Sequence, residues 1–185
     1  VSWMGFSNNP LFLGVLNVEK TLYIFNPKTG ERLVKEKGIR AMPDGIAWIE
    51  GDFLLIGDLE NPGTLVVVNA HRKSLSRVTL TNCGKIHCVA TEQKRFAVAD
   101  EEKNIFVYEF ISGDEPPNLL SITQPSDIEG DMTVLLLYED KLCFGTTEGA
   151  HYLFTSDGKT FEEREEIQTD SSLYSSMEAE EEEEE

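Results

Sequence analysis

The chain has 185 residues, which is long enough for one domain with a sizeable core, and 40% of them are hydrophobic. Its 34 acidic residues outnumber its 16 basic residues and give a formal net charge of −18 at pH 7, which disfavours direct binding to nucleic acid. The longest apolar runs, Val134–Tyr138 and Leu65–Val68, fall far short of the roughly 20 residues that a membrane helix needs, so we expect no membrane partner.

Four β-rich runs recur along the chain, and each is followed by a turn. They are Leu22–Asn26, Leu65–Asn69, Ile105–Glu109 and His151–Thr155. Their fourth residues, Phe25, Val68, Tyr108 and Phe154, are spaced by 43, 40 and 46 positions. Before each run lies a second apolar stretch, at Leu11–Gly14, Phe53–Gly57, Phe96–Ala99 and Lys141–Gly145. A further strand precedes each stretch, at Val1–Phe6, Gly45–Ile49, Lys85–Ala90 and Met132–Tyr138.

Three short strands and a variable connection, repeated at this interval, are typical of a β-propeller blade. Turn-forming residues separate the strands, as in Asn26–Gly30 and Asn61–Gly63, and no segment before residue 160 has a sustained helical period. Because one blade cannot bury both faces of its sheet, the blades must stack on one another. We therefore predict an all-β fold, a partial propeller of about four blades at residues 1–42, 43–83, 84–130 and 131–161, followed by a disordered acidic tail at 162–185.

The repeats resemble those of the WD-repeat family over residues 1–160. The segments Val1–Ser7 and Leu22–Gly30 read like the first and third strands of that family, as do Gly84–Val89 and Val98–Glu109. Three acids stand six residues before the blade's signature position, as in the family: Glu19, Glu102 and Glu148. No blade has the Trp-Asp dipeptide or the Gly-His pair, so the subfamily stays open. The resemblance implies WD-like blades that serve as a protein-binding platform.

Candidate catalytic and metal-binding residues are scattered. Cys83 and Cys88, with His87 beside them, miss the spacing of a structural zinc site, and we expect buried thiols instead. The three histidines, His71, His87 and His151, fall in different blades, so we expect no catalytic triad, no metal, no cofactor and no enzyme activity. A propeller hydrolase or lyase with its site in a central channel remains an alternative.

Charged groups between the strands are expected to be solvated. This applies to the acids Asp100–Glu102 and Glu139–Asp140 at turns, and to the basic cluster His71–Lys73 with Arg77 in a loop and an outer strand. The segment Thr155–Phe161 resembles the Asp-box hairpin of sialidase-type and sortilin-type propellers, and the alternative is an ordinary Asp-Gly turn. Neither interpretation of this hairpin is catalytic.

Residues 162–185 hold 12 acids and one base, Arg164, and their low apolar content predicts disorder. A polyanionic arm of this kind suits basic partners such as histones or ribosomal proteins, and the alternatives are a solubilising terminus or a linker. The residues expected to bind such a partner are Glu178, Glu180, Glu181, Glu182, Glu183, Glu184 and Glu185. Hydroxyls near acids suit acid-directed kinases, and these are Thr169, Ser171, Ser172, Ser175 and Ser176.

The function that these features favour is a protein-interaction scaffold within a multiprotein assembly. The alternatives are a chaperone or binder of basic proteins that acts through the tail, and the propeller enzyme. The chain starts inside a strand without Met, so we expect it to be part of a longer polypeptide. We also expect sequence outside it, or another chain, to complete a ring of about seven blades. Three sparse cysteines favour the cytoplasm or the nucleus.

Overall fold

The computed structural model describes residues 1–9, 11–125, 130–139, 141–149, 151–156 and 161–166. Within these ranges the chain forms sixteen β-strands and one 3-10 helix, Pro43–Gly45. No helix in them has the length and apolar character needed to span a membrane. The strands form four antiparallel sheets of four strands each, and the strands of a sheet follow one another in chain order.

The four sheets are built from consecutive stretches of sequence. The first holds β1 (Trp3–Phe6), β2 (Leu13–Leu16), β3 (Thr21–Phe25) and β4 (Arg32–Lys37). The second holds β5 (Ile46–Ile49), β6 (Phe53–Gly57), β7 (Thr64–Asn69) and β8 (Ser74–Thr79). The third holds β9 (Ile86–Glu92), β10 (Arg95–Asp100), β11 (Ile105–Glu109) and β12 (Asn118–Thr123), and the fourth holds β13 (Met132–Tyr138), β14 (Lys141–Thr146), β15 (His151–Ser156) and β16 (Phe161–Glu166).

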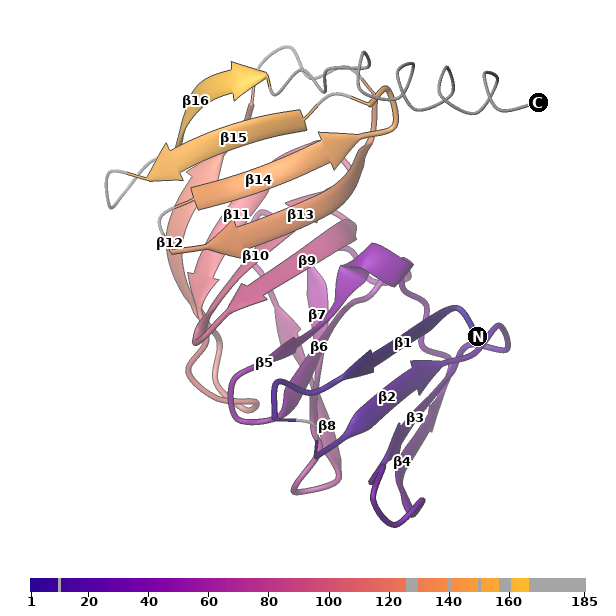
Figure 1. Cartoon of the computed structure of the whole chain (residues 1–185). Helices are drawn as coiled ribbons and strands as arrows, with labels where there is room; N and C mark the ends of the chain where they lie inside the picture. Colours follow the sequence, from indigo (N-terminus) through magenta and orange to yellow (C-terminus); the bar gives the residue numbers. More distant parts are fainter. Residues whose placement is uncertain (10, 126–129, 140, 150, 157–160, 167–185) are drawn as a thin grey trace, which may run out of the picture.

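The sheets lie side by side along an open arc, with the first sheet at the lower right and the fourth at the top of Figure 1. The innermost strands β1, β5, β9 and β13 follow one another along this arc. This arrangement confirms the prediction of an all-β fold with four propeller blades in part of a ring.

Each sheet has a fourth, outermost strand that we had counted as part of a variable connection. β4 and β8 have the same pattern of half-buried and exposed residues and lack a continuous apolar run. An outermost strand has a neighbour on one side only, so its side chains are exposed or half-buried and its sequence carries little hydrophobic signal. The prediction of three strands per blade was therefore wrong.

The strand β16 also changes the boundary of the acidic tail. It pairs with β15, with Tyr152 opposite Glu166 and Ser156 opposite Phe161. Residues 162–166 therefore belong to the fourth sheet, and the expectation that they are disordered was wrong. Backbone pairing does not require apolar side chains, and the outermost strand β4 is similarly rich in charge. Residues 167–185 lie outside the described residues.

Three buried hydrophobic clusters fill the spaces between neighbouring sheets. The first and second sheets share a cluster that includes Leu22, Ile24, Trp48 and Leu54. The second and third sheets share the largest aromatic set, Phe96, Phe106, Tyr108 and Phe110. The third and fourth sheets meet through smaller residues on one side, Cys88, Ala90, Ala97 and Ala99, and larger ones on the other, Leu135, Leu137, Leu142 and Phe144. None of these clusters joins the first sheet to the fourth within the described residues.

Polar contacts join the innermost strands of successive blades. The indole Nε1 of Trp48 donates a hydrogen bond to the carbonyl of Gly5 at 2.9 Å. The hydroxyl of Thr91 donates in turn to the carbonyl of Trp48 at 2.7 Å. These contacts fix how each blade sits against the one before it, because a buried donor that loses its partner destabilises the fold.

A polar side chain at the end of the second strand organises the following turn in each of the first three blades. Asn17 accepts a hydrogen bond from the backbone of Thr21 at 2.9 Å, and Asp58 accepts one from the backbone of Glu60 at 2.9 Å. Asp100 is the most highly connected of the three. Local hydrogen bonds of this kind from Asn and Asp stabilise turns.

Asp100 is buried, with an exposed fraction of 3%, and was wrongly predicted to be a solvated turn acid. One oxygen accepts hydrogen bonds from the backbone of Glu102 and of Asn104, at 3.0 and 2.9 Å. The other accepts from the backbone of Gly84 at 3.0 Å and from the Asn104 amide at 3.1 Å. Strand β10 continues through Asp100, so this side chain lies at a buried strand end and only Glu101 and Glu102 face solvent.

We predict that Asp100→Ala lowers the free energy of unfolding by about 2–4 kcal/mol, because four donors lose a buried, charged acceptor. Glu102→Ala is the control, since this side chain is exposed, and it is expected to change stability by less than about 0.5 kcal/mol. Urea unfolding followed by circular dichroism measures both. Equal effects of the two substitutions would contradict the assigned role of Asp100.

Gly57, at the end of β6 in the second sheet, packs closely against Ile86 of the third sheet. A Cβ atom there would lie 2.5 Å from Cγ2 and 2.6 Å from Cβ of Ile86, which is fully buried in β9. We expect Gly57→Ala to destabilise the protein by about 1–3 kcal/mol through overpacking. The cost should fall in an Ile86→Gly background, which removes both Cβ and Cγ2, and thermal unfolding of the four chains in this cycle tests the coupling. Additive effects of the two substitutions would show that the contact between residues 57 and 86 does not limit how closely the two sheets pack.

Candidate functional site

Two hollows lie on either side of Phe53, where the second and third blades meet. Strand β6 supplies Phe53 directly after the turn at Gly51 and Asp52, both of which have a positive φ. The connection between β11 and β12 passes over the same ring, and a Cβ at Gly113 would lie 3.0 Å from Cε1 of Phe53. Glycine at 113 therefore lets this connection approach the aromatic ring closely.

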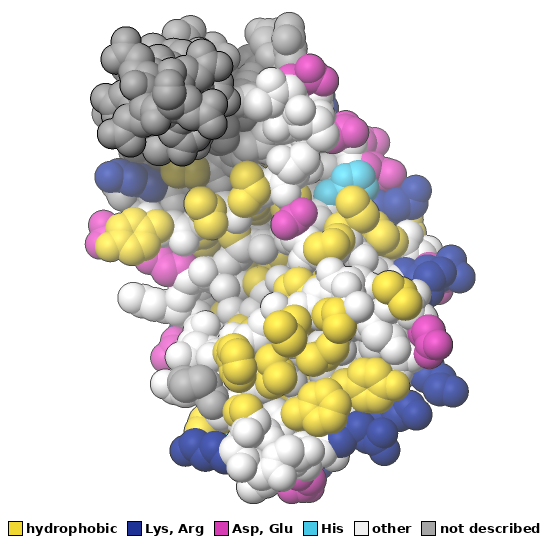
Figure 2. All heavy atoms as spheres, turned by 45° about the vertical axis from the view of Figure 1, so that its right-hand side comes forward, with side chains coloured by type: hydrophobic (Ala, Val, Ile, Leu, Met, Phe, Trp, Pro, Cys, Tyr) yellow, Lys and Arg dark blue, Asp and Glu magenta, His cyan; other side chains and the backbone are white. Residues whose placement is uncertain are grey.

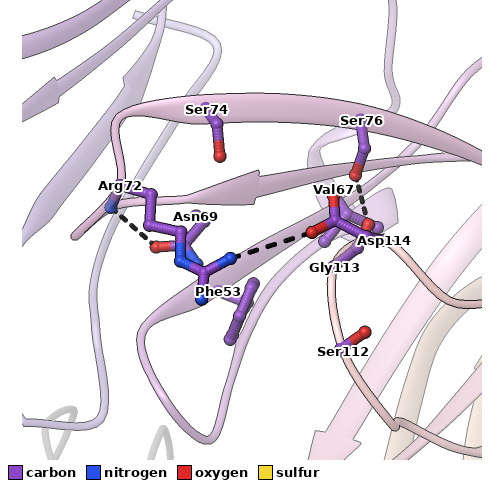
Figure 3. Close-up of a pocket in the computed structure, with 9 residues that line it drawn as sticks. All are labelled: Phe53, Val67, Asn69, Arg72, Ser74, Ser76, Ser112, Gly113 and Asp114. Carbon is purple, nitrogen blue, oxygen red and sulfur yellow. Dashed lines mark hydrogen bonds and ion pairs between the residues drawn. The ribbon is translucent and has the colours of Figure 1, made fainter.

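The first hollow is polar and has a volume of about 90 Å³. Figure 3 shows Arg72, Asn69 and Ser74 on one side of it and Ser112, Gly113 and Asp114 on the other, with Phe53 below Arg72. The backbone N–H of Arg72 donates to the Asn69 side chain at 2.9 Å, and the hydroxyl of Ser76 donates to the Gly113 carbonyl. The hydroxyls of Ser74 and Ser112 have no hydrogen-bond partner among the described residues.

The Arg72 guanidinium bridges the two blades but is held loosely. It lies 3.8 Å from the Asp114 carboxylate, and the two side chains are 75% and 79% exposed. An exposed ion pair at this distance contributes little to stability. Arg72 is therefore free to exchange Asp114 for a carboxylate or a hydroxyl of a bound molecule.

The second hollow is more apolar and has a volume of about 230 Å³. Phe53, Phe110 and Ile111 form its apolar part, and Glu50 and Lys94 border it. The rings of Phe53 and Phe110 meet edge to face with centroids 5.0 Å apart, and Ile111 is 47% exposed. A hollow of this kind accepts an aliphatic or aromatic side chain.

No pattern in the sequence marks these two hollows. The basic cluster was correctly predicted to be exposed in a loop and an outer strand, because Arg72 and Lys73 lie in the turn before β8 and Arg77 is exposed in β8 itself. Its neighbours Phe53, Phe110 and Asp114 come from other strands and loops, and no spacing in the sequence links them. The sequence contains one indication of this site, which is Gly113 among polar residues. Because many loops have this composition, it does not by itself identify a binding site.

The three histidines lie on different elements of the structure. Nε2 of His71 lies 3.0 Å from the buried Asp52 carboxylate, and its ring meets Phe12 edge to face. His87 is half-buried in β9 and His151 lies in β15. Within the described part of the chain, no group of three or more His, Cys, Asp and Glu side chains could hold a metal ion.

Cys83, Cys88 and Cys143 are free thiols, and of these only Cys88 is fully buried as predicted. Burial raises the pKa of Cys83 to about 12, and the nearby Asp100 carboxylate adds to this rise. Burial likewise raises the pKa of Cys88 to about 12, with a smaller contribution from Asp44. Both thiols are protonated near neutral pH and are therefore poor nucleophiles.

Tyr108, which stands at the signature position of the third blade, has a buried hydroxyl without a hydrogen-bond partner among the described residues. Burial raises its pKa, and the nearby Cys83 and Asp100 raise it further. The three acids that the WD-repeat resemblance singled out, Glu19, Glu102 and Glu148, are all exposed. The turns are instead held by Asn17, Asp58 and Asp100.

Two sets of predicted residues lie outside the described part of the chain. The central residues of the predicted hairpin, 157–160, belong to the first set. The second set comprises the expected phosphorylation and partner-binding positions of the tail, which are Thr169, Ser171, Ser172, Ser175, Ser176, Glu178, Glu180, Glu181, Glu182, Glu183, Glu184 and Glu185.

Comparison with protein-family models and with curated proteins gives no match. Solved structures are similar. The WD40 repeats of RRP9 match with a TM-score of 0.68 and 11% identity, over 90% of this chain and 53% of that chain. The complex of KlAtg21 with the coiled-coil of AgAtg16 matches with a TM-score of 0.66 and 13% identity, over 83% of this chain and 52% of that chain.

A computationally designed protein, Ika4, matches with a TM-score of 0.63 and 16% identity, over 83% of this chain and 89% of that chain. The chain thus spans about half the length of the RRP9 and KlAtg21 chains and nearly the whole of the designed one. At these identities the likeness establishes the fold alone. The chain has the fold of a WD-repeat-like β-propeller, of which it forms four blades.

Proposed function

We propose that this chain is a protein-interaction scaffold, which holds protein partners on the rim and loops of its blades. The observation that carries the proposal is the pair of hollows beside Phe53 at the junction of the second and third blades. One hollow suits an apolar side chain, and the other offers Arg72 and two unpaired hydroxyls to an acidic or hydroxyl-bearing side chain. The likeness to the WD40 repeats of RRP9, and to KlAtg21 in its complex with a coiled-coil, supports the same general role.

The surface around the hollows fits a short peptide better than a small metabolite. The polar hollow is only about 90 Å³, well below the roughly 300–1,000 Å³ of ordinary ligand pockets. Side chains of one extended peptide point alternately to opposite sides, so residues two apart can enter neighbouring hollows. The positive charges of Arg72 and Lys94 are matched by the negative charges of Asp114 and Glu50. The peptide motif we propose therefore has one acidic side chain beside an apolar one and is not strongly charged.

The three free thiols support a reducing compartment, the cytoplasm or the nucleus, as the place where this scaffold acts. A partner class of other proteins, without a cofactor, is part of the same proposal. We propose that the scaffold acts within a larger multiprotein assembly.

We predict that peptides selected from a displayed random library for binding to the chain carry an apolar residue close to an acidic one. Arg72→Glu and Ile111→Glu should each weaken the selected peptides at least about tenfold, a loss of about 1.4 kcal/mol, because one removes the cation and the other charges the apolar hollow. Fluorescence polarisation measures the affinity.

The matched control is Lys37→Glu, an exposed charge reversal on β4 that lies in the first blade. It is expected to leave peptide affinity unchanged. Failure to select any peptide, or equal effects of the three substitutions, would contradict a binding site at these hollows.

We propose a second binding element in the acidic segment, which would act on basic proteins. Residues 162–185 carry 12 of the 34 acids of the chain and one base. The glutamates at 178 and 180–185 would supply the charge, and phosphorylation of Thr169, Ser171, Ser172, Ser175 or Ser176 would increase it.

Deletion of residues 170–185 is expected to weaken binding to a purified histone at least about tenfold at low salt and to flatten its salt dependence, because screened charge attraction drives the contact. Replacement of the seven glutamates by glutamine keeps the length and should have the same effect. Unchanged affinity and salt slope in titrations would show that the segment serves as a solubilising end or a linker.

A further inference from the structure

Every sheet in this chain has two distinct faces. We define the upstream face as the one turned toward the preceding sheet, and the downstream face as the one turned toward the next. In the second sheet, Ile46 and Trp48 lie on the upstream face and Ile49 on the downstream face. In the third sheet, Val89 lies upstream and Cys88 and Ala90 downstream. Each internal junction therefore joins a downstream face to an upstream face.

The upstream face of the first sheet is apolar and has no neighbour among the described residues. Met4 and Phe6 on β1 are 63% and 56% exposed. Cross-strand pairing places Val15 and Tyr23 in line with Met4, and Leu13 and Phe25 in line with Phe6, so that all six side chains share this face. The rings of Tyr23 and Phe25 stack with centroids 6.0 Å apart. Figure 2 shows hydrophobic side chains gathered in the lower half of the view, bordered by Lys and Arg.

The downstream face of the fourth sheet is apolar in the same way. On β13, Val134, Leu136 and Tyr138 are 40%, 60% and 64% exposed, while the alternate residues Leu135 and Leu137 are buried against the third sheet. Cys143 on β14 is paired with Leu136 and shares its face. Exposed apolar surfaces of this kind mark interaction sites in soluble proteins.

These two free faces are of opposite type, one upstream and one downstream. Each junction inside the chain joins one downstream face to one upstream face. The two end faces are therefore the pair of surfaces that a further junction of the same kind requires. Their outermost strands also differ in charge. Strand β4 contains Arg32, Lys35 and Lys37 with one acid, whereas β16 contains four glutamates with one arginine.

Ion pairs already join the outer parts of neighbouring blades within the chain. Lys73 of the second blade lies 3.4 Å from Glu31 of the first, and Arg72 lies 3.8 Å from Asp114 of the third. A junction between the fourth and first blades would bring the acidic β16 and the basic β4 to the same side of the ring. Charge complementarity of this kind sets the register and the choice of partner more than the strength of an interface.

We propose that a second copy of this chain covers both faces, so that two chains close one ring of eight blades. The chain spans 53% of the WD40 structure it matches, which is the share expected for about half of a ring. Eight blades lie within the usual range of about four to eight. The two new junctions are identical and related by a twofold axis, with the fourth blade of each copy against the first blade of the other. This inference is independent of the proposed scaffold function, because it does not involve the hollows beside Phe53.

The test measures the mass of the 185-residue chain in solution by light scattering coupled to size exclusion, over about 1–100 µM. The expected mass is twice the 20.8 kDa of a single chain. Phe6→Lys on the first sheet and Leu136→Glu on the fourth should each give a monomer, because each of the two junctions contains one altered face. An equimolar mixture of the two variants should recover the dimer, since one junction is then unaltered and the other joins opposite charges.

The control Val18→Glu alters an apolar residue that is even more exposed, at 76%, in the turn before β3, and this variant should stay dimeric. Circular dichroism and thermal unfolding establish that every variant is folded. A wild-type monomer, longer open assemblies, or a dimer that only one of the two face variants disrupts would each overturn the proposal. A monomeric chain that still binds the selected peptides would refute ring closure and leave the scaffold function intact.

Discussion

The packing of one sheet against the next is the constraint on which the whole structure depends. Each sheet is only four strands wide and has two apolar faces, so it is stable only when both faces are covered. Three clusters meet this need inside the chain, and Gly57 against Ile86 shows how closely the sheets approach. Among the described residues, each end of the arc has one sheet face without a neighbouring sheet, and exposed apolar side chains lie on it.

Several polar groups between and beside the sheets connect one blade to another. Trp48 and Thr91 join innermost strands by hydrogen bonds to backbone carbonyls, and Asp100 holds both a turn and the connection from the preceding blade. Because these groups lie between or beside the sheets, they fix the position of one blade relative to another. The same stacking brings the connection at residues 110–114 against Phe53 of the second blade, and the two hollows lie at this contact.

The surface beside Phe53 and the two end faces differ in the chemistry they offer. The hollows combine a loosely paired cation, two hydroxyls and a small apolar surface, which suits a short peptide segment. The end faces carry several exposed apolar side chains, such as Phe6 on the first sheet and Leu136 on the fourth, which suits packing against another sheet. A chain with both kinds of surface can close its ring with one and hold partners with the other.

The sequence by itself determined the all-β class, the repeat and the inner three strands of every blade, because buried strands carry a continuous apolar signal. It did not reveal the outermost strands or the extension of the fourth sheet to Glu166, since strands such as β4 and β16 pair through the backbone and their sequences are rich in charged residues. Asp100 was misjudged for a related reason, as its burial depends on Gly84 from a neighbouring connection. Only the tertiary structure brought Arg72, Phe53 and Asp114 together, because distant segments become neighbours only when blades stack.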